Sequence, residues 1–261
     1  MPDRDPAGAG PSEDLHFTHA IDIPGHGTVR GEIDLRGAFA SCLAGVPLHG
    51  KRVLDVGALS GFTSFALEAL GAEVVSYDRA GGRHWDLVPF CTGAPAPQLV
   101  SLLDAHQARI SRAYRFSHAA FGSRAERIEG DLYSIPAAIG PVDAALIGSL
   151  PHLRDPLRAL HGALRLVQET AVIVGLLPRP SWLARLDDLR GDAPLAFLPR
   201  TSRTHPSGPL WRIPPRTVVR WLRILGFGET RIAYRRCPSG DRTGTLYAVV
   251  GRRTQANRSE V

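Results

Sequence analysis

The stretch at residues 51–78, KRVLDVGALSGFTSFALEALGAEVVSYD, constrains the fold of this chain more than any other. An apolar run at residues 53–56 is typical of a buried parallel strand, and it leads into a glycine-containing turn at residues 57–61. The apolar spacing after this turn predicts a helix that ends at Gly71, followed by a second strand that ends at Asp78. The stretch therefore predicts a β-α-β unit with a carboxylate at the end of its second strand.

A β-α-β unit of this kind suits adenosine-containing cofactors. Glycines let a ligand approach the backbone, N–H groups at the start of the helix face it, and the carboxylate accepts hydrogen bonds from ribose hydroxyls. A dinucleotide-binding turn that starts at Gly57 would need glycine at Leu59 and Phe62, which are bulky. A phosphate-binding loop is not indicated either, because the G-x-x-x-x-G-K at residues 45–51 precedes the strand and is followed by Arg52.

The spacing of the turn resembles motif I of the class I S-adenosylmethionine-dependent methyltransferases. That motif is an acidic residue, any residue, a glycine and, a few residues later, a second glycine; here it runs from Asp55 through Gly57 to Gly61. The resemblance implies an α/β fold, a doubly wound, seven-stranded Rossmann-like methyltransferase sheet whose last strand is antiparallel, with S-adenosyl-L-methionine as the cofactor. It also implies that the backbone at the two glycines lies against the methionine portion and that Asp78 holds the ribose.

Two further predicted strands end at residues that the family uses for the cofactor. Residues 126–131 predict a third strand, and the resemblance implies that Asp131 accepts from the adenine amino group while Leu132 covers the ring. Residues 141–148 predict a fourth strand of buried type. The candidate cofactor-binding residues are Asp55, Gly57, Ala58, Gly61, Asp78, Asp131, Leu132, Gly148 and Ser149.

Two segments resemble, more specifically, the group of the tRNA wobble-uridine (5-methoxyuridine/5-oxyacetic acid) methyltransferases. Residues 17–23, FTHAIDI, match that group's aromatic-x-His-x-Ile-Asp-Leu, and an Asp-Leu-Arg follows at residues 34–36. Residues 148–156 match its Gly-Ser-x-x-x-His-Leu-x-Asp-Pro with one residue fewer. The resemblance implies that the N-terminal segment closes over the cofactor as a lid, with His19 and Arg36 near the site.

His152 and His19 are the candidate catalytic residues. They are the histidines that the resemblance places near the cofactor, and imidazole suits proton transfer near neutral pH. A structural role for His19 stays open beside the catalytic one. His16 and His19 could alternatively bind a metal ion, but no third ligand occurs at a telling spacing, so we expect no metal site.

Three further residues are candidates for the substrate side of the site. Arg36 belongs to the expected lid, and Trp85 stands in a Trp-Asp pair within a Gly- and Pro-rich insertion, the kind of long loop that lines sites. Trp211 begins an aromatic-x-x-Pro run in a proline-rich arm at residues 178–214 that could roof a substrate. Plain packing roles for both tryptophans stay open.

The rest of the chain completes this organisation. Helices are predicted at residues 38–43, 99–121, 157–166 and 215–225, and strands at 170–177, 229–236 and 243–250, with two short strand-like pieces around a turn at 24–27. We expect a disordered leader at 1–14, an N-terminal lid at 15–50, a methyltransferase domain at 51–251 with its arm at 178–214, and a tail at 252–261.

Composition bounds the location and the partners. No apolar run approaches the ~18 to 20 residues of a membrane helix, and the N-terminus lacks a signal core, so we expect a cytoplasmic protein without a membrane partner.

Three scattered cysteines indicate neither a zinc site nor a disulfide framework and suit small buried residues. The net charge of +6 allows a nucleic-acid partner. The arginines are nevertheless spread along the chain, and the oligomeric state is not indicated.

The sequence is therefore interpreted as an S-adenosylmethionine-dependent methyltransferase that acts on an O or N atom of a small molecule, such as one made in specialised biosynthesis. Two alternatives stay open. The first is a tRNA-modifying methyltransferase of the wobble-uridine group, which would show a continuous basic surface with aromatic stacking positions. The second is a domain that binds the cofactor without catalysis and serves as a scaffold.

Overall fold

The computed structural model describes residues 14–81, 85–87, 96–177, 194–199, 208–239 and 242–254. Several predicted features lie outside the described residues. These are residues 1–13 of the leader, parts of the insertion around Trp85, residues 178–193 and 200–207 of the arm, Cys91, and residues 255–261 of the tail.

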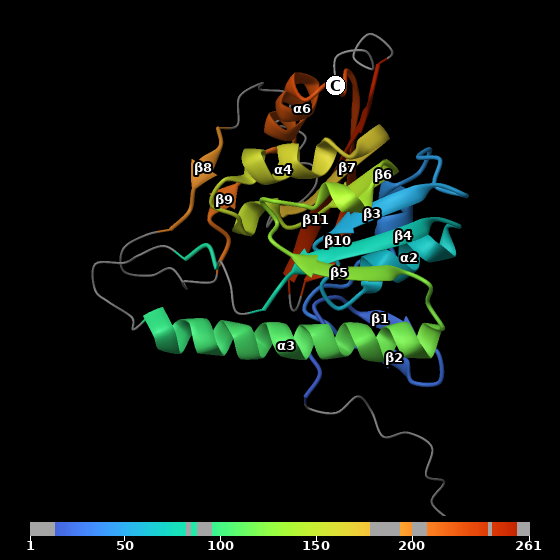
Figure 1. The fold of residues 1–261 in the computed structure, drawn as a ribbon, viewed down its shortest axis with the longest axis vertical. Helices are drawn as coiled ribbons and strands as arrows, with labels where there is room; N and C mark the ends of the chain where they lie inside the picture. The colour runs from blue at the N-terminus through green and yellow to red at the C-terminus, as the bar shows by residue number, and fades with distance from the viewer. Residues whose placement is uncertain are drawn as a thin grey trace, which may run out of the picture.

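A seven-stranded sheet forms the centre of the fold (Figure 1), in the order β10-β11-β7-β6-β3-β4-β5. β3 to β7 pair in parallel, whereas β11 is antiparallel to both β7 and β10. The strands are β3 (Arg52–Val56), β4 (Glu73–Arg79), β5 (Glu126–Gly130), β6 (Val142–Ile147), β7 (Val167–Leu177), β10 (Glu229–Ser239) and β11 (Arg242–Arg252). The predicted α/β sheet with an antiparallel last strand is thereby confirmed.

Helices cover both faces of the sheet (Figure 1), with α2 and α3 on one face and α4 and α6 on the other. The helices are α1 (Phe39–Cys42), α2 (Phe62–Ala69), α3 (Ala96–Phe121), α4 (Pro156–Leu164) and α6 (Pro215–Ile224). Consecutive residues of a strand point to opposite faces, so Leu54 belongs to the core under α4 and α6, and Val53 to the core under α1 and α2. Two hydrophobic cores therefore enclose the sheet.

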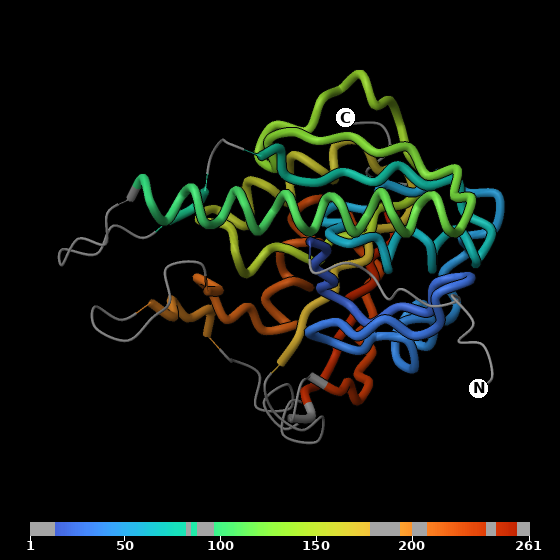
Figure 2. Tube along the Cα trace, turned by 90° about the horizontal axis from the view of Figure 1, so that it is seen from below, coloured from blue at the N-terminus to red at the C-terminus, as the bar shows by residue number. Residues whose placement is uncertain are grey.

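α3 is a 26-residue helix that runs along one side of the molecule (Figure 2). Ala113 and Tyr114 in its middle are buried against the α2 side, whereas Leu102 near its start is largely exposed.

Within the part of the chain that the structure describes, no helix is both long and apolar enough to cross a membrane.

Most predicted elements are found within a few residues of their expected bounds. The main differences are strand lengths, since β7 begins at Val167 and β10 reaches Ser239. Strand pairing uses backbone groups, so pairs such as Pro238 opposite Thr243 extend the hairpin past the predicted end at Arg236 without an apolar pattern that would predict them. Two short 3₁₀ helices, η1 (Ala137–Ile139) and η2 (Leu150–His152), were not predicted.

The N-terminal segment forms the expected pair of short strands, β1 (Ile21–Ile23) and β2 (Gly27–Val29), beside α3 (Figures 1 and 2). The chain then packs on the C-terminal hairpin β10–β11. The guanidinium of Arg235 donates to the Ser41 hydroxyl at 2.8 Å, and that of Arg252 donates to the Gly45 carbonyl at 2.8 Å. Cys42 and Cys237 are buried free thiols, as expected for small hydrophobic residues.

Gly175 in β7 lets the side chain of Tyr247 pack closely against the backbone of the neighbouring strand. It lies directly opposite Tyr247 in β11, and a Cβ atom at Gly175 would lie 2.5 Å from atoms of the Tyr247 phenol. The Tyr247 hydroxyl donates to the Ile213 carbonyl at 3.1 Å. The phenol therefore passes over Gly175 to join the segment before α6 to the sheet.

We expect Gly175→Ala to lower the free energy of unfolding by about 1 to 3 kcal/mol, because the added methyl group must displace the Tyr247 ring. Chemical denaturation measures the change. Gly37→Ala is the matched control, since no heavy atom lies within 4 Å of a Cβ placed at Gly37. An equal loss in both variants would show that the Tyr247 contact is not the cause.

Candidate functional site

The candidate site lies where three parallel strands end side by side. β3 lies between β4 and β6, so the chain leaves β3 toward one neighbour and later returns to the other side. A switch point of this kind opens a ligand crevice at the carboxyl ends of the strands. Gly57 follows β3, Asp78 lies near the end of β4, and Ser149 follows β6. The structure thus gathers three of the predicted cofactor residues at one edge of the sheet.

Gly57 and Ser149 make the closest approach across this crevice. Gly57 has a φ of +84°, and a Cβ atom there would lie 3.0 Å from the Ser149 Oγ. The Ser149 Oγ is buried and has no hydrogen-bond partner among the described residues. Because buried hydroxyls are almost always paired, this atom marks a place for a ligand group. A backbone cradle beside an unpaired hydroxyl fits an adenosine cofactor.

Leu59 at the tip of the turn adopts a left-handed conformation, with a φ of 52° that is rare for residues with a side chain. Its N–H donates to Oδ2 of Asp78 at 2.9 Å, and its carbonyl accepts from the Arg127 guanidinium at 3.5 Å. Strained backbone of this kind persists where surrounding contacts enforce it, often at functional sites. Asp78 and Arg127 therefore hold the turn in shape from both ends of Leu59.

The Asp78 carboxylate is almost fully buried. Its Oδ1 accepts from the Arg79 N–H at 2.8 Å and its Oδ2 from Leu59, while a guanidinium nitrogen of Arg127 lies 4.0 Å away. Burial raises the pKa of Asp78, and these N–H groups and the Arg127 charge oppose that rise. Each oxygen retains a lone pair that the turn does not use. Those lone pairs are available to hydrogen-bond donors of a ligand.

Asp55 lies beneath the turn and is 2% exposed. Its Oδ2 accepts from the hydroxyls of Thr63 and Ser64, both at 2.7 Å, and the hydroxyl chain continues through Ser76 to Tyr114 in two contacts of 2.8 Å. Burial raises the pKa of Asp55 to about 6. In this structure Asp55 therefore supports the start of α2 from below the turn.

The predicted adenine residues lie at the same edge of the sheet. Asp131 is exposed just past β5, and its Oδ1 accepts from the Tyr133 N–H at 2.9 Å. The Tyr77 hydroxyl donates to the Asp131 backbone carbonyl at 3.0 Å, which ties this turn to the strand that carries Asp78. Leu132 is 6% exposed, packed in the core under α4.

The N-terminal segment contacts the turn through Thr18. Its N–H and hydroxyl lie 3.2 and 2.9 Å from the Ser60 Oγ. The next residue, His19, packs its ring 5.8 Å from that of Phe62. Burial lowers the pKa of His19 to about 4, and its Nδ1 is a second buried atom without a partner among the described residues. The predicted lid segment therefore places a neutral imidazole beside the start of α2.

Arg36 is held within the N-terminal segment. Its guanidinium donates to Asp34 at 2.7 Å and to Asp22 at 2.5 Å. The Arg36 guanidinium also donates to the Thr28 hydroxyl. Arg36 was predicted to contact the substrate. Its observed contacts are therefore structural.

A second cluster forms around the loop that carries His152. The exposed His152 ends η2, and the arm strands β8 (Ala196–Phe197) and β9 (Trp211–Arg212) pack beside this loop. The Leu210 N–H donates to the Pro151 carbonyl at 2.8 Å, and the Trp211 indole donates to the Arg154 carbonyl at 3.2 Å. The described part of the arm therefore contacts the His152 loop through Leu210 and Trp211.

The insertion is tied to the same loop. Asp86 accepts from the Tyr133 hydroxyl at 2.5 Å and from the Arg154 N–H at 3.0 Å. The neighbouring Trp85 indole donates to Asp104 in α3 at 2.8 Å. Asp86 and Trp211 thus meet the His152 loop from segments that are distant in sequence, whereas the Trp85 indole contacts α3.

Sequence reasoning missed several residues that hold these parts together. Tyr133 and Arg127 flank the predicted Asp131, and a charged residue inside a predicted strand was the available signal for Arg127. The contact of Thr18 with Ser60 joins residues 42 positions apart and leaves no periodic trace in the sequence.

No protein-family model and no curated protein matches the chain. The fold is similar to that of the N-terminal domain of EvdMO1 with S-adenosylhomocysteine bound, at 18% identity and a TM-score of 0.57, over 93% of each chain. It is also similar to the Burkholderia thailandensis 1,6-didemethyltoxoflavin-N1-methyltransferase with bound 1,6-didemethyltoxoflavin and S-adenosylhomocysteine, at 16% identity and a TM-score of 0.51, over 85% of this chain and 78% of that one.

A third similar structure is the S-adenosylmethionine-dependent methyltransferase SibL, at 19% identity and a TM-score of 0.50, over 85% of this chain and 56% of that one. At these identities the likeness establishes the fold alone. The sheet order and the antiparallel last strand agree with the methyltransferase fold expected from the sequence.

The raised pKa of Asp55 generates a pH-dependent prediction. Between the ordinary value of 3.8 and about 6, the folded protein holds a proton that the unfolded chain has lost. The contribution of this carboxyl to stability therefore falls as pH rises through that window and is constant above it. Asp55→Asn keeps an oxygen acceptor for Thr63 and Ser64 but removes the ionisation.

We expect Asp55→Asn to gain stability relative to the unmodified protein by roughly 1 to 3 kcal/mol as pH rises through this window. Denaturant unfolding at several pH values measures the difference. The opposite effect of His19, whose lowered pKa weakens the fold as pH falls, is common to both proteins and cancels. A difference that stays constant with pH would contradict the assignment.

Proposed function

We propose that this protein is an S-adenosylmethionine-dependent methyltransferase that acts on an O or N atom of a small molecule. The observation that carries the proposal is the cradle of Gly57 against Ser149, where the backbone is open to close approach and a buried hydroxyl lacks a partner. Asp78 lies at the end of the next strand, in the position that suits ribose. The structural neighbours with bound S-adenosylhomocysteine share this fold and support the choice of cofactor.

The proposed cofactor contacts follow the sheet edge. The backbone of Gly57, Ala58 and Gly61 would face the methionine portion, with Gly148 and the Ser149 hydroxyl opposite. Asp131 would accept from the adenine amino group through an oxygen that its own turn leaves open. Asp55 would act indirectly, by holding the helix start that presents its N–H groups to the ligand.

The cofactor supplies a methyl group on a sulfonium, and the protein must hold the acceptor in line with it, so positioning provides most of the rate. Where the acceptor carries a proton, a base is needed. His19 is poorly suited, since a pKa of about 4 means that its ring holds a proton weakly at neutral pH. His152 is exposed on the loop after β6, at the carboxyl edge of the sheet. We therefore assign the base role to His152.

The acceptor side would be formed by the region around the His152 loop. Trp211 and Phe197 place their rings 5.1 Å apart on the arm, and Trp85 lies on the insertion tied to the same loop. Aromatic side chains beside a few polar groups suit a compact, partly apolar acceptor. Arg36 would contribute by shaping the N-terminal segment through Asp34 and Asp22.

The tRNA wobble-uridine reading stays the alternative, because the motifs at residues 17–23 and 148–156 resemble that group. The charge distribution argues against this alternative. Several arginines of the described chain are engaged internally, such as Arg36 on carboxylates and Arg235 and Arg253 on backbone carbonyls. An arginine held in this way contributes little to a continuous phosphate-binding surface.

We expect Asp78→Ala to weaken S-adenosylhomocysteine binding by about tenfold or more, because ribose hydroxyls would lose a buried acceptor, at roughly 1 to 3 kcal/mol for each unpaired group. Titration calorimetry measures the affinity. Glu73→Ala is the control, since Glu73 is an exposed carboxylate at the opposite end of the same strand. Unchanged affinity in a folded Asp78→Ala protein would place the ribose elsewhere.

We expect His152→Ala to lower methyl transfer by roughly 10²- to 10⁴-fold, because a positioned base is lost. Transfer of tritium from labelled S-adenosylmethionine to an acceptor found by screening small molecules measures the rate. Affinity for S-adenosylhomocysteine should change less than about threefold. The exposed His161 in α4 provides the control variant, His161→Ala. Loss of cofactor binding in His152→Ala would instead make His152 a cofactor ligand, and transfer to no acceptor would favour the scaffold alternative.

A further inference from the structure

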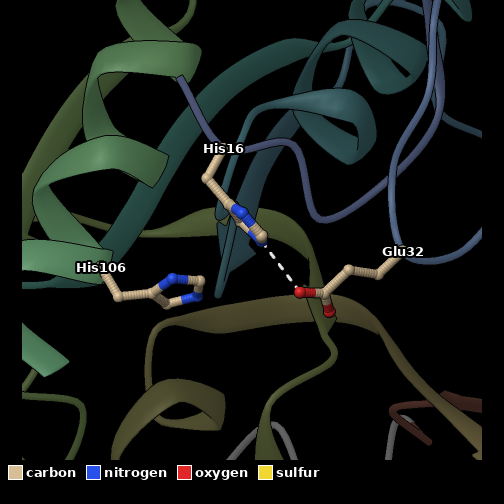
Figure 3. A group of neighbouring side chains, drawn as sticks. All are labelled: His16, Glu32 and His106. Atoms are coloured by element: carbon tan, nitrogen blue, oxygen red, sulfur yellow. Dashed lines mark hydrogen bonds and ion pairs between the residues drawn. The ribbon is translucent and has the colours of Figure 1, made fainter. Parts of the chain in front are cut away.

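Three potential metal ligands meet outside the candidate cofactor site: His16, Glu32 and His106 (Figure 3). Their nitrogen and carboxylate oxygen atoms all lie within 4.8 Å of one another. The His16 Nε2 lies 2.8 Å from Oε1 of Glu32, and the two imidazole centroids are 4.3 Å apart. Figure 3 shows His16 between the other two side chains.

From the sequence His16 was considered as a metal ligand but no metal site was expected, because the members of this cluster come from three separate segments. His16 precedes β1, Glu32 follows β2, and His106 belongs to α3. A spacing search around His16 therefore finds no third ligand, whereas the fold supplies two. Metal-binding residues often come from distant segments in this way, because folding and metal binding assemble the site together.

The donor atoms suit a borderline divalent cation. Two imidazole nitrogens and one carboxylate oxygen form a donor set that zinc accepts, with a water molecule completing the coordination. The side chains of His16 and Glu32 are 23% and 58% exposed, so an ion and its water can reach them from solvent.

The three ligand atoms must move slightly closer together to coordinate one ion. Ligand atoms at about 2.0 to 2.2 Å from a tetrahedral zinc lie roughly 3.3 Å apart, so no pair of ligand atoms would need to draw in by more than about 1.5 Å. The His16–Glu32 pair is already within that distance. Glu32 is the more exposed partner, so its side chain can rotate toward His106 without disturbing the core.

We propose that His16, Glu32 and His106 bind one Zn²⁺ ion that fastens the N-terminal segment to α3. A backbone hydrogen bond already joins the same two segments, since the His16 N–H donates to the carbonyl of Arg109 in α3 at 3.3 Å. Two residues further on, Thr18 contacts Ser60 of the turn at residues 57–61. The ion therefore secures the segment that covers the turn. The site is independent of the proposed methyl transfer.

The test is zinc titration of the full chain without a histidine tag, after removal of metal with a chelator. Competition with a chromophoric zinc indicator should give one tight equivalent, and Co²⁺ in its place should give a visible d–d band. Millimolar Mg²⁺ should not compete, since it prefers oxygen ligands. Zinc should also raise the midpoint of thermal unfolding, because it binds the folded state.

Two variants make the test specific. His106→Ala and Glu32→Gln should each weaken zinc binding by at least about tenfold, since even residues behind the ligands change affinity by that factor. Glu32 is exposed, so its variant keeps the fold if His106→Ala does not. His161→Ala should bind zinc like the unmodified protein. No tight equivalent, or equal binding by the unmodified protein and both variants, would overturn the proposal and leave His16 and Glu32 as a simple hydrogen-bonded pair.

Discussion

The hydrogen bond from the Leu59 N–H to the Asp78 carboxylate holds the edge of the sheet on which the candidate site is built. It joins the turn after β3 to the end of β4, and Arg127 completes the link by reaching both Asp78 and the Leu59 carbonyl. The left-handed conformation of Leu59 persists because these groups enforce it. If the turn relaxed, Gly57 would lose its close approach to Ser149, and the cradle would open.

Around this edge the described residues form two regions. Beneath the turn, the Asp55 carboxylate is paired with hydroxyls, and the N-terminal segment contacts the turn at Ser60. The second region is built from segments that meet at the His152 loop, through Asp86 and Trp211. Under the proposed function, the first region would hold the cofactor and the second would hold the acceptor, an arrangement in which one fold can serve many acceptors. The choice of substrate would then depend on the second region.

Most strands and the main helices were predictable because apolar periodicity and glycine turns are local signals, and the seven-stranded sheet with its antiparallel last strand followed from the family resemblance. Gly57 and Asp78 could be located for the same reason. What could not be predicted is where charges and hydroxyls find partners. The contacts of Asp55 with Thr63 and of Arg36 with Asp34 have no signal in the sequence, and His16 has partners that only the fold brings near. Long-range polar contacts leave no period in the sequence.

The packing of residues 34–45 on the hairpin β10–β11 has a consequence for how the protein is made. Arg235 and Arg252 reach Ser41 and Gly45 across 194 and 207 positions of the chain. A ribosome needs roughly 10 to 40 seconds to add that many residues. Residues 34–45 therefore leave the ribosome early and gain these two contacts only with the last strands. Until then, the N-terminal segment can be held only by contacts with earlier parts of the chain, such as that of Thr18 with Ser60.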